Sequence, residues 1–321
     1  MYAPLPDPLR DLAALQRGII TRRQALAAGL TDDLIESWIA RGRWQRVYPG
    51  VYATFTGVLA RESALWAVVL FAGEGAVLSY ETAAELDGLT DRPAAVMHVT
   101  IPSRRRVAPV AGIVVHRRHD AEAAAHPARL PPRTRIEETV LDLADCSPTA
   151  EAAVSWVTAA LGRRLTTQPK LHFALGQRSQ ARWRRDLHFA LSPDLAGVHS
   201  LLEYHYVRDV EVPHRLPRGI RQAPGRQAGR RVYRDVLYDE YGLIVELDGR
   251  SAHPDEARWA DVLRDNLVTA AGQGTLRYGY WQVRNTPCMV AAQVAAALQS
   301  RGWPSRPHPC TPSCLLPRRV S

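Results

Sequence analysis

Two apolar runs separated by a short polar turn constrain the C-terminal half of this 321-residue chain most strongly. Residues 232–238 and 243–247 have the length and composition of β-strands, and the sequence Asp-Glu-Tyr-Gly at 239–242 lies between them. Gly242 occupies the turn position that is expected to need a positive φ, which glycine adopts without a steric penalty. The stretch therefore predicts a strand, a tight turn and a second strand.

Three carboxylates interrupt these apolar runs. Asp235 lies in the first predicted strand, while Glu246 and Asp248 lie two residues apart in the second and so share one face of it. An unpaired charge in a buried strand is costly, and converging carboxylates repel one another unless a cation lies between them. Their hard oxygen atoms favour Mg²⁺. The residues alone also allow a polar sheet edge, with the acids solvated or paired with arginines.

The flanking sequence supplies further elements around this hairpin. Ser200 caps a predicted helix that carries Glu203 three residues on, at the capping-box position. After the second strand come His253, a predicted amphipathic helix at 254–271 and a predicted strand at 275–281. The charged residues of that amphipathic helix are Arg258, Asp261, Arg264 and Asp265. The order is a helix with Glu, a strand with Asp, a strand with Glu-x-Asp, a helix and a strand.

This order resembles the restriction-endonuclease-like (PD-(D/E)XK) superfamily over residues 197–298, and more closely its very-short-patch-repair (Vsr-like) branch and a related bacterial family. The resemblance implies a mixed sheet flanked by helices. It makes Asp235 the metal-binding Asp of the first core strand and Glu246 the Glu of the Glu-x-Lys signature. It also equates Glu203 with the Glu of the preceding helix, and His253 with the His that follows the glycine in Vsr-like enzymes.

One position departs from the family pattern. Asp248 stands where the signature has a lysine, which orients the attacking water and balances the local charge. His253, Arg250 and Arg264 are the candidates to supply that positive charge. The candidate catalytic residues are Glu203, Asp235, Glu246, Asp248 and His253, and the candidate Mg²⁺ ligands are Asp235, Glu246 and Asp248.

Two functional hypotheses follow from this pattern. The first is a Mg²⁺-dependent DNA endonuclease, in which the metal activates water and stabilises the phosphate transition state. The second is a non-catalytic DNA-binding regulator or antitoxin that keeps the fold without the chemistry. The four family residues that are retained favour the first hypothesis, and the missing lysine favours the second.

The first 56 residues predict a winged helix-turn-helix. Its helices and hairpin are expected at residues 7–15, 21–28, 31–41 and 44–52. Thr21 and Gln24 have the spacing of a capping box, and Gly29 and Gly42 are typical of the position just after a helix. The third helix would enter the major groove of DNA. The alternative is a set of helices that merely pack together.

Three arginines of this segment are candidate contacts to DNA. Arg41 lies at the end of the third helix, and Arg43 and Arg46 lie on the wing. Their planar guanidinium groups can bind phosphate oxygens through two hydrogen bonds.

The same segment resembles the N-terminal domain of AbiEi-type antitoxins from type IV toxin–antitoxin systems. The similarity covers residues 9–54 and is carried by Ile-Thr-Arg-Arg-Gln-Ala from residue 20 and by Gly-Arg-Trp-Gln-Arg-Val-Tyr-Pro-Gly-Val-Tyr at 42–52. Residues 134–144 resemble a downstream antitoxin segment more weakly. The resemblance implies a DNA-binding regulator with a cognate toxin as partner.

The middle of the chain predicts an α/β region. Helices are expected at 61–72, 80–86, 134–144 and 150–161, and strands at 96–101 and 112–116. Arg104 and Arg105 in a basic loop are candidate phosphate contacts, with a solvated turn as the alternative. The stretch at 215–234, rich in arginine and glycine and ending at Arg234, is expected to be a loop. It either lines the mouth of a nucleic-acid groove or is a flexible surface loop. Arg234, and Arg264 in the helix predicted at 254–271, are candidate contacts to DNA.

The net charge of +9 and the pI of about 9.8 favour polyanionic partners such as double-stranded DNA. Lys170 is the only lysine, so part of this basicity reflects a compositional bias toward arginine. No run of about 18 apolar residues predicts a membrane span. The N-terminus lacks the pattern of a signal peptide, so a cytoplasmic protein is expected.

The C-terminal tail is rich in proline and is expected to be extended. The four cysteines are too scattered for a disulfide framework. Cys310 and Cys314, with His308 nearby, lack a second pair of ligands, so their spacing argues against a zinc site. The sequence thus predicts a multidomain α/β protein, with a winged helix at 1–56, an α/β region at 57–195, an endonuclease-like domain at 196–302 and a tail at 303–321.

Overall fold

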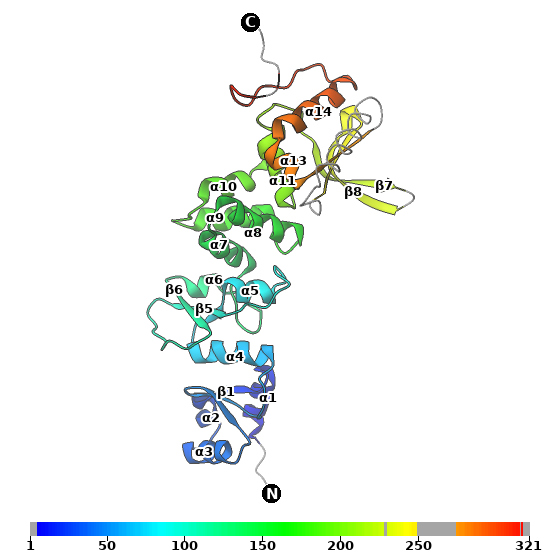
Figure 1. Cartoon of the computed structure of the whole chain (residues 1–321). Coiled ribbons are helices and arrows are strands. Elements are labelled where there is room, and N and C mark those ends of the chain that lie inside the picture. Colours follow the sequence, from blue (N-terminus) through cyan, green and yellow to red (C-terminus); the bar gives the residue numbers. More distant parts are fainter. Residues whose placement is uncertain (1–4, 228–229, 249–273, 315, 317–321) are drawn as a thin grey trace. The chain divides into compact units, whose positions relative to one another are not determined.

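The computed structural model describes residues 5–227, 230–248, 274–314 and 316 (Figure 1). The chain forms two compact units, of residues 1–143 and 144–321. The division falls inside helix α7 (Ile136–Cys146). The predicted boundaries at residues 56 and 195 lie within these units, so the fourfold division stays a prediction.

The first unit begins with the predicted winged helix-turn-helix elements. They are α1 (Asp7–Leu15), β1 (Ile19–Thr21), α2 (Arg22–Ala27), α3 (Asp32–Ala40), β2 (Gln45–Tyr48) and β3 (Val51–Ala53). Thr21 and Gln24 form the predicted capping box, because the Thr21 hydroxyl accepts from the Gln24 N–H at 3.1 Å and the Gln24 carboxamide accepts from the Thr21 N–H at 2.8 Å. Strand β1 was not predicted. It pairs antiparallel with β3, and β3 pairs antiparallel with β2.

Helix α4 (Arg61–Ala72) closes the core of this winged helix. Trp66 and Ala67 of α4 form one buried cluster with Ile19, Val51 and Ala53 of the winged-helix sheet. The helix begins five residues beyond the predicted domain boundary. A chain cut at residue 56 would therefore expose an apolar surface on each side of the cut.

A second three-stranded sheet completes the first unit. It has the order β4-β5-β6, with β4 antiparallel and β6 parallel to β5. Its strands are β4 (Val77–Leu78), β5 (Met97–Pro102) and β6 (Ile113–Arg118). Helix α5 (Tyr80–Leu86) lies between β4 and β5 in the sequence, and helix α6 (Ala121–Ala124) follows β6. The helices and strands predicted for this region are confirmed to within a few residues.

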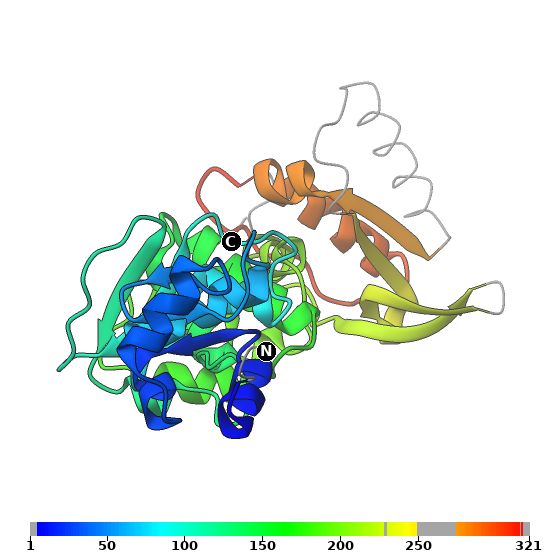
Figure 2. The same ribbon diagram turned by 90° about the horizontal axis from the view of Figure 1, so that it is seen from below.

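The second unit contains a group of helices (Figure 1) and a four-stranded mixed sheet (Figure 2). The helices are α8 (Ala150–Gly162), α9 (Gln168–Gln177), α10 (Arg184–Ala190), the 3₁₀ turn η1 (Pro193–Leu195) and α11 (Leu201–His205), which continues as the π-helix η2 (Tyr206–Glu211). The sheet contains β7 (Ile220–Gln227), β8 (Arg230–Tyr238), β9 (Leu243–Asp248) and β10 (Thr275–Gly279), with the 3₁₀ turn η3 (Asp239–Tyr241) between β8 and β9. Helices α13 (Tyr280–Asn285) and α14 (Pro287–Gln299) follow.

The sheet order is β10-β9-β8-β7. The first three strands in sequence pair antiparallel, and β10 pairs parallel to β9. The predicted strand–turn–strand is confirmed, and Gly242 has a φ of 57° in the left-handed region. The strand predicted at 275–281 ends at Gly279, because Tyr280 already begins α13.

The prediction of a loop at 215–234 is wrong. Most of this stretch forms β7 and the first half of β8. The apolar alternation that marks a strand is missing because the inward-facing Arg221 is an ion. It is 9% exposed and pairs with Glu211, which is 4% exposed. Pro224 fits because β7 is an edge strand, where a missing backbone donor is tolerated.

An apolar core lies between α14 and the sheet. Val290, Val294 and Leu298 of the helix pack with Val236 and Val245 of the central strands. Trp303 and Leu316, from the segment after α14, belong to the same buried cluster. The described part of the tail has neither helix nor strand, but it is anchored to this core.

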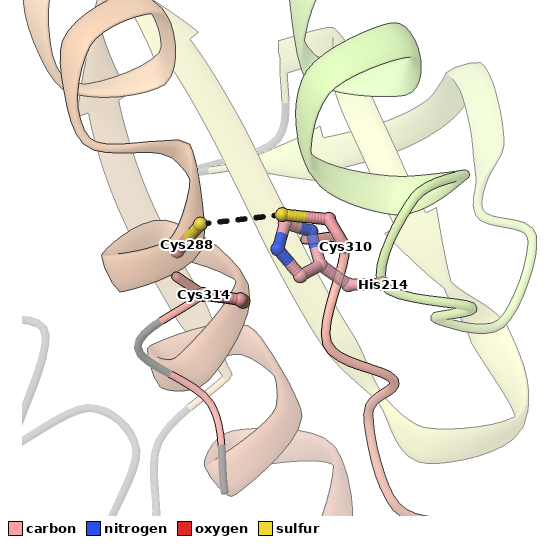
Figure 3. A group of neighbouring side chains, drawn as sticks. All are labelled: His214, Cys288, Cys310 and Cys314. Carbon is pink, nitrogen blue, oxygen red and sulfur yellow. Dashed lines mark hydrogen bonds between the residues drawn. The ribbon is translucent and has the colours of Figure 1, made fainter. Parts of the chain in front are cut away.

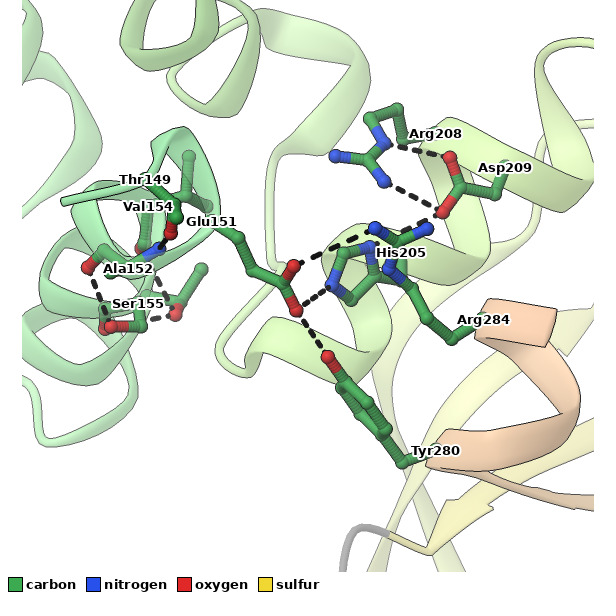
Figure 4. Close-up of polar contacts among 11 residues, drawn as sticks. Thr149, Glu151, Ala152, Val154, Ser155, His205, Arg208, Asp209, Tyr280 and Arg284 are labelled. Atoms are coloured by element: carbon green, nitrogen blue, oxygen red, sulfur yellow. Dashed lines mark hydrogen bonds and ion pairs between the residues drawn. The ribbon is translucent and has the colours of Figure 1, made fainter. Parts of the chain in front are cut away.

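Polar contacts of Glu151 tie α8 to α11 and α13 (Figure 4). Its carboxylate lies 3.0 Å from Nε2 of the buried His205, accepts a hydrogen bond from the Tyr280 hydroxyl and lies 3.6 Å from Arg284. His205 also contacts Asp209, at 3.2 Å through Nδ1. Helix α8 is therefore held to the elements around the mixed sheet, although the sequence places it in the middle region.

None of the described helices is long and apolar enough to cross a membrane.

Candidate nucleic-acid interface and carboxylate site

The exposed face of α3 in the winged helix carries acids that are paired with arginines from neighbouring elements. Nε of Arg22 donates to Asp32 at 2.7 Å, and Arg46 of the wing reaches Glu36 at 2.5 Å. These ion pairs are largely exposed, so each contributes little to stability. They do neutralise two carboxylates that would otherwise repel DNA phosphates.

The three predicted DNA contacts of this domain differ in their surroundings. Arg41 is exposed at the C-terminal end of α3. The guanidinium of Arg43 lies over the Trp38 ring, 5.8 Å from its centroid, and that of Arg46 lies over Tyr52 at 5.6 Å. Arg41 lies at the end of α3 and Arg46 lies in β2 of the wing, whereas Arg43 lies in the turn between α3 and β2. Whether the three arginines bind DNA stays a prediction.

The basic loop that follows β5 is less accessible than the sequence suggests. Arg104 is exposed and pairs with Glu122 at 3.0 Å. Arg105 is half-buried and packs against Gly73, where an added Cβ would lie only 2.3 Å from its guanidinium. Of these two predicted phosphate contacts, only Arg104 extends from the surface.

In the second unit, a glutamine links two of the predicted catalytic carboxylates. The Gln222 side-chain amide donates to Glu203 at 3.1 Å and to Asp235 at 3.4 Å. Glu203 is held at the start of α11 by the His199 N–H and the Ser200 hydroxyl, at 3.1 and 3.0 Å. The capping role predicted for Ser200 is confirmed, since its hydroxyl accepts from the Glu203 N–H.

Gln222 is in a strained conformation, with a φ of 48°. A residue other than glycine in this left-handed region raises the conformational free energy by about 1–3 kcal/mol, and residues strained in this way are concentrated at functional sites. Sequence inspection missed Gln222, because neither its type nor its spacing distinguishes it from any other polar residue of an arginine-rich stretch.

The other two acids lie near Asp235 in different environments. Asp235 accepts a hydrogen bond from the backbone N–H of Leu247 in β9 at 2.7 Å. Glu246 is half-buried and forms an ion pair with Arg234 at 3.0 Å, so this predicted DNA contact is engaged with a predicted metal ligand. Asp248 is exposed at the end of β9.

Burial and mutual repulsion set the charge state of these acids. Burial raises the pKa of Glu203 to about 7, with a further contribution from the charge of Asp235. The pKa of Asp235 is also raised, mainly by burial and then by the charges of Glu246 and Asp248. Glu203 is therefore partly protonated near neutral pH, and the share of each rise that comes from neighbouring carboxylates is a repulsion that a cation would relieve.

The carboxylates do not, however, form a set that is tight enough to share an ion. In the part of the chain that the structure describes, the carboxylate oxygen atoms of Asp235, Glu246 and Asp248 are not close enough to one another to hold one metal ion. Arg277 of β10 stands opposite Glu246 in the strand register and was not predicted. His253, Arg250 and Arg264, with the helix predicted at 254–271, lie outside the described residues.

The raised pKa of Glu203 predicts how stability depends on pH. The folded protein binds this proton more tightly than the unfolded chain, whose ordinary pKa is 4.5, so the stabilisation is complete below about pH 4.5 and is lost as the pH rises through about 7. Between these limits the wild type should lose on the order of 3 kcal/mol relative to Glu203→Gln. Urea unfolding without added Mg²⁺ or Mn²⁺, followed by hydrogen exchange of α11 and β8 peptides, measures the second unit alone.

The matched control for this prediction is Glu240→Gln, which changes an exposed carboxylate in the turn between β8 and β9. It should leave the pH profile of the wild type unchanged. Parallel profiles for wild type and Glu203→Gln would contradict the raised pKa.

Comparison with known proteins gives one assignment. Residues 7–54 match the family described as "Transcriptional regulator, AbiEi antitoxin". A solved structure, that of the RV2827C protein from Mycobacterium tuberculosis, is 17% identical with a TM-score of 0.39, over 60% of this chain and 77% of that one. This likeness is too low to support an argument about fold or function. No curated protein matches the chain. The N-terminal winged helix is thus an AbiEi antitoxin-like domain.

Proposed function

We propose that this protein is a DNA-binding transcriptional regulator of the antitoxin type, which docks on duplex DNA through the winged helix at residues 7–54. The observation that carries the proposal is the agreement between the family match and the geometry of this segment. Helix α3 is capped by Thr31 and is followed directly by the β2–β3 wing. A cognate toxin is the partner that an antitoxin role implies.

The charge distribution suits binding that depends on the DNA backbone. Two of the three acids of α3, Asp32 and Glu36, are neutralised by Arg22 and Arg46, and Arg41 remains exposed beside the wing. Arginine–phosphate contacts release counterions, so affinity should fall steeply as the salt concentration rises. Base-reading side chains are scarce on α3, so most of the affinity is expected to come from phosphates.

Substituting Arg41 tests this interface. Arg41→Glu should weaken binding to a duplex by roughly tenfold and reduce the slope of log affinity against log salt by about 1. Fluorescence anisotropy with a labelled duplex over a salt series measures both quantities. Arg92→Glu is the matched control, because Arg92 is exposed in the same unit but lies outside the winged helix. Equal losses in the two variants would show that only net charge matters.

A second candidate function, metal-dependent cleavage of DNA phosphodiesters, is favoured by the carboxylate site. Glu203 and Asp235 converge on the strained Gln222, and Glu246 lies close enough for its charge to raise the pKa of Asp235. Three antiparallel strands followed by a parallel fourth also support the restriction-endonuclease-like resemblance of residues 196–302.

In that candidate function, Asp235 and Glu246 would hold Mg²⁺, with Asp248 as a further ligand. The ion, when bound, would lower the pKa of a water molecule and stabilise charge on the phosphate. The residues would have to draw closer than they lie now, and Glu246 would have to exchange Arg234 for the ion. Neutralisation by a cation would also remove the repulsion that now acts on Asp235.

A further inference from the structure

Four side chains from three separate parts of the sequence meet at one point of the second unit (Figure 3). They are His214, Cys288, Cys310 and Cys314, and their ligand atoms all lie within 4.8 Å of one another. His214 precedes β7, Cys288 lies in the first turn of α14, and the other two cysteines lie in the segment after α14. No other group of three or more such side chains is found in the part of the chain that the structure describes.

His214 is oriented as a metal ligand would be. It is completely buried, and its Nδ1 lies 2.7 Å from the carbonyl oxygen of Val210, so Nδ1 carries the hydrogen and donates it. The Nε2 atom is buried and has no hydrogen-bond partner among the described residues. A buried nitrogen without a partner is costly. Metal-binding histidines usually donate their other N–H to a carbonyl or carboxylate, which fixes the ring in the way seen here.

The sulfur atoms complete a set with the chemistry of zinc. The Sγ atoms of Cys288 and Cys310 are 3.5 Å apart, and Cys314 lies beside them. In a tetrahedral site with Zn–S of about 2.3 Å and Zn–N of about 2.0 Å, ligand atoms are separated by roughly 3.5–3.8 Å. The observed spread requires a contraction of only about 1 Å. Three thiolates and one imidazole are soft ligands that select zinc over Mg²⁺ or Ca²⁺.

A disulfide between Cys288 and Cys310 is the competing chemistry. It would use two of the three sulfur atoms and engage neither Cys314 nor Nε2 of His214, which would be left to interact with each other. None of the four cysteines forms a disulfide in the structure. A metal ion satisfies all four converging side chains at once, and a disulfide does not.

We propose that His214, Cys288, Cys310 and Cys314 bind one Zn²⁺ in a closed structural site. Four protein ligands leave no open position for water, so the ion would stabilise the fold without taking part in catalysis. It would fasten the tail to α14 and to the segment before β7. The tail already follows this path, because the His308 N–H donates to the His214 carbonyl at 2.8 Å.

The spacing of Cys310 and Cys314 argued against zinc because the other two ligands of this cluster lie far away in the sequence. That argument rested on the lack of a second pair of ligands beside Cys310 and Cys314. The pair is supplied by His214 and Cys288, which are 74 residues apart (288 − 214) and are brought together only by the fold. His308, the histidine considered with the two cysteines, is exposed and contributes its backbone N–H instead.

Metal analysis of the full-length protein tests the proposal first. Protein purified under reducing conditions without chelator should contain about one zinc ion per chain by plasma mass spectrometry. After removal of the metal, added Co²⁺ should give the intense visible absorption of a tetrahedral thiolate site. Protein that neither retains zinc nor binds added Zn²⁺ or Co²⁺ would overturn the proposal, as would a mass deficit of two hydrogen atoms assigned to a Cys288–Cys310 disulfide.

Thiol alkylation of the wild type identifies the ligands without any variant. With zinc bound, iodoacetamide should modify Cys146, which is exposed, while Cys288, Cys310 and Cys314 are protected. After zinc removal all four should react, and peptide mapping by mass spectrometry resolves them. Protection that is unchanged when zinc is removed would show that burial alone shields these thiols, and would contradict a metal site.

Variants give the final comparison. Cys314→Ser should lower zinc content by roughly tenfold or more after dialysis, and Cys146→Ser should not change it. His214→Gln should shift the Co²⁺ spectrum or abolish it, because the nitrogen ligand is lost. Equal zinc content in the wild type, Cys314→Ser and His214→Gln would place the ion elsewhere in the protein and refute the assignment.

Discussion

Replacing Asp235 with asparagine is expected to abolish metal-dependent DNA cleavage, by about 10³-fold or more, if the second candidate function is correct. The substitution removes one charge at nearly constant volume. An asparagine oxygen can still accept the Leu247 N–H that Asp235 accepts at 2.7 Å, so folding should survive. Affinity for DNA should not weaken, because one negative charge is lost and the winged helix is unchanged. Plasmid nicking with Mg²⁺ or Mn²⁺, beside anisotropy, separates the two effects.

Two comparisons make this test specific. Asp239→Asn, an identical change at an exposed position in the turn between β8 and β9, should leave any cleavage intact. Asp248→Lys restores the signature of the family, and a gain of activity would mark the natural protein as a degenerate nuclease that is kept for binding. If the wild type cuts nothing with either metal, and Asp235→Asn behaves like the wild type in every DNA assay, cleavage should be discarded in favour of regulation alone.

Removing Glu211 is expected to destabilise the second unit by about 3–5 kcal/mol, because it leaves the guanidinium of Arg221 buried without its counter-ion. Glu211 also accepts the Tyr238 hydroxyl at 3.0 Å and the Gly219 N–H at 3.3 Å. The pair therefore joins the end of η2 to β7 and β8. Urea unfolding of Glu211→Ala, followed by hydrogen exchange of β8 peptides, measures the loss.

The reference substitution for Glu211 is Glu122→Ala, which breaks the exposed pair with Arg104 and should cost no more than about 1 kcal/mol. The double variant Glu211→Leu with Arg221→Met should regain at least half of the loss, since no charge is then left buried. If Glu211→Ala and Glu122→Ala cost the same, the buried pair is not what holds β7 in place.

Local signals in the sequence predicted the local features of the fold. The capping box at Thr21, the cap at Ser200 and the left-handed Gly242 each follow from chemistry within four residues of chain, and each is confirmed. Strand β7 was missed because a buried ion pair replaces the apolar alternation there. Arg221 can face inward only because Glu211 forms an ion pair with it, and the sequence pattern of neither segment indicates this contact.

The sites show the same limit. Strand parity indicated that Asp235 and Glu246 lie near each other, but not that Gln222 would link Asp235 to Glu203, or that Glu246 would pair with Arg234. The cluster of His214 with three cysteines depends on contacts between distant segments. Short-range spacing carries no information about such contacts, so only the folded chain shows them.

Helix α4 packs against the winged-helix sheet, since Trp66 and Ala67 form one buried cluster with Ile19, Val51 and Ala53. This packing affects which segment can be moved into another protein by gene recombination. The stretch that matches the antitoxin family ends at residue 54, before α4 begins at Arg61. A recombination joint placed between them would transfer a winged helix with one face of its core open to water. A joint placed after α4 would transfer a closed core. A segment that keeps its core closed after such a transfer therefore extends through α4, beyond residue 54 where the family match ends.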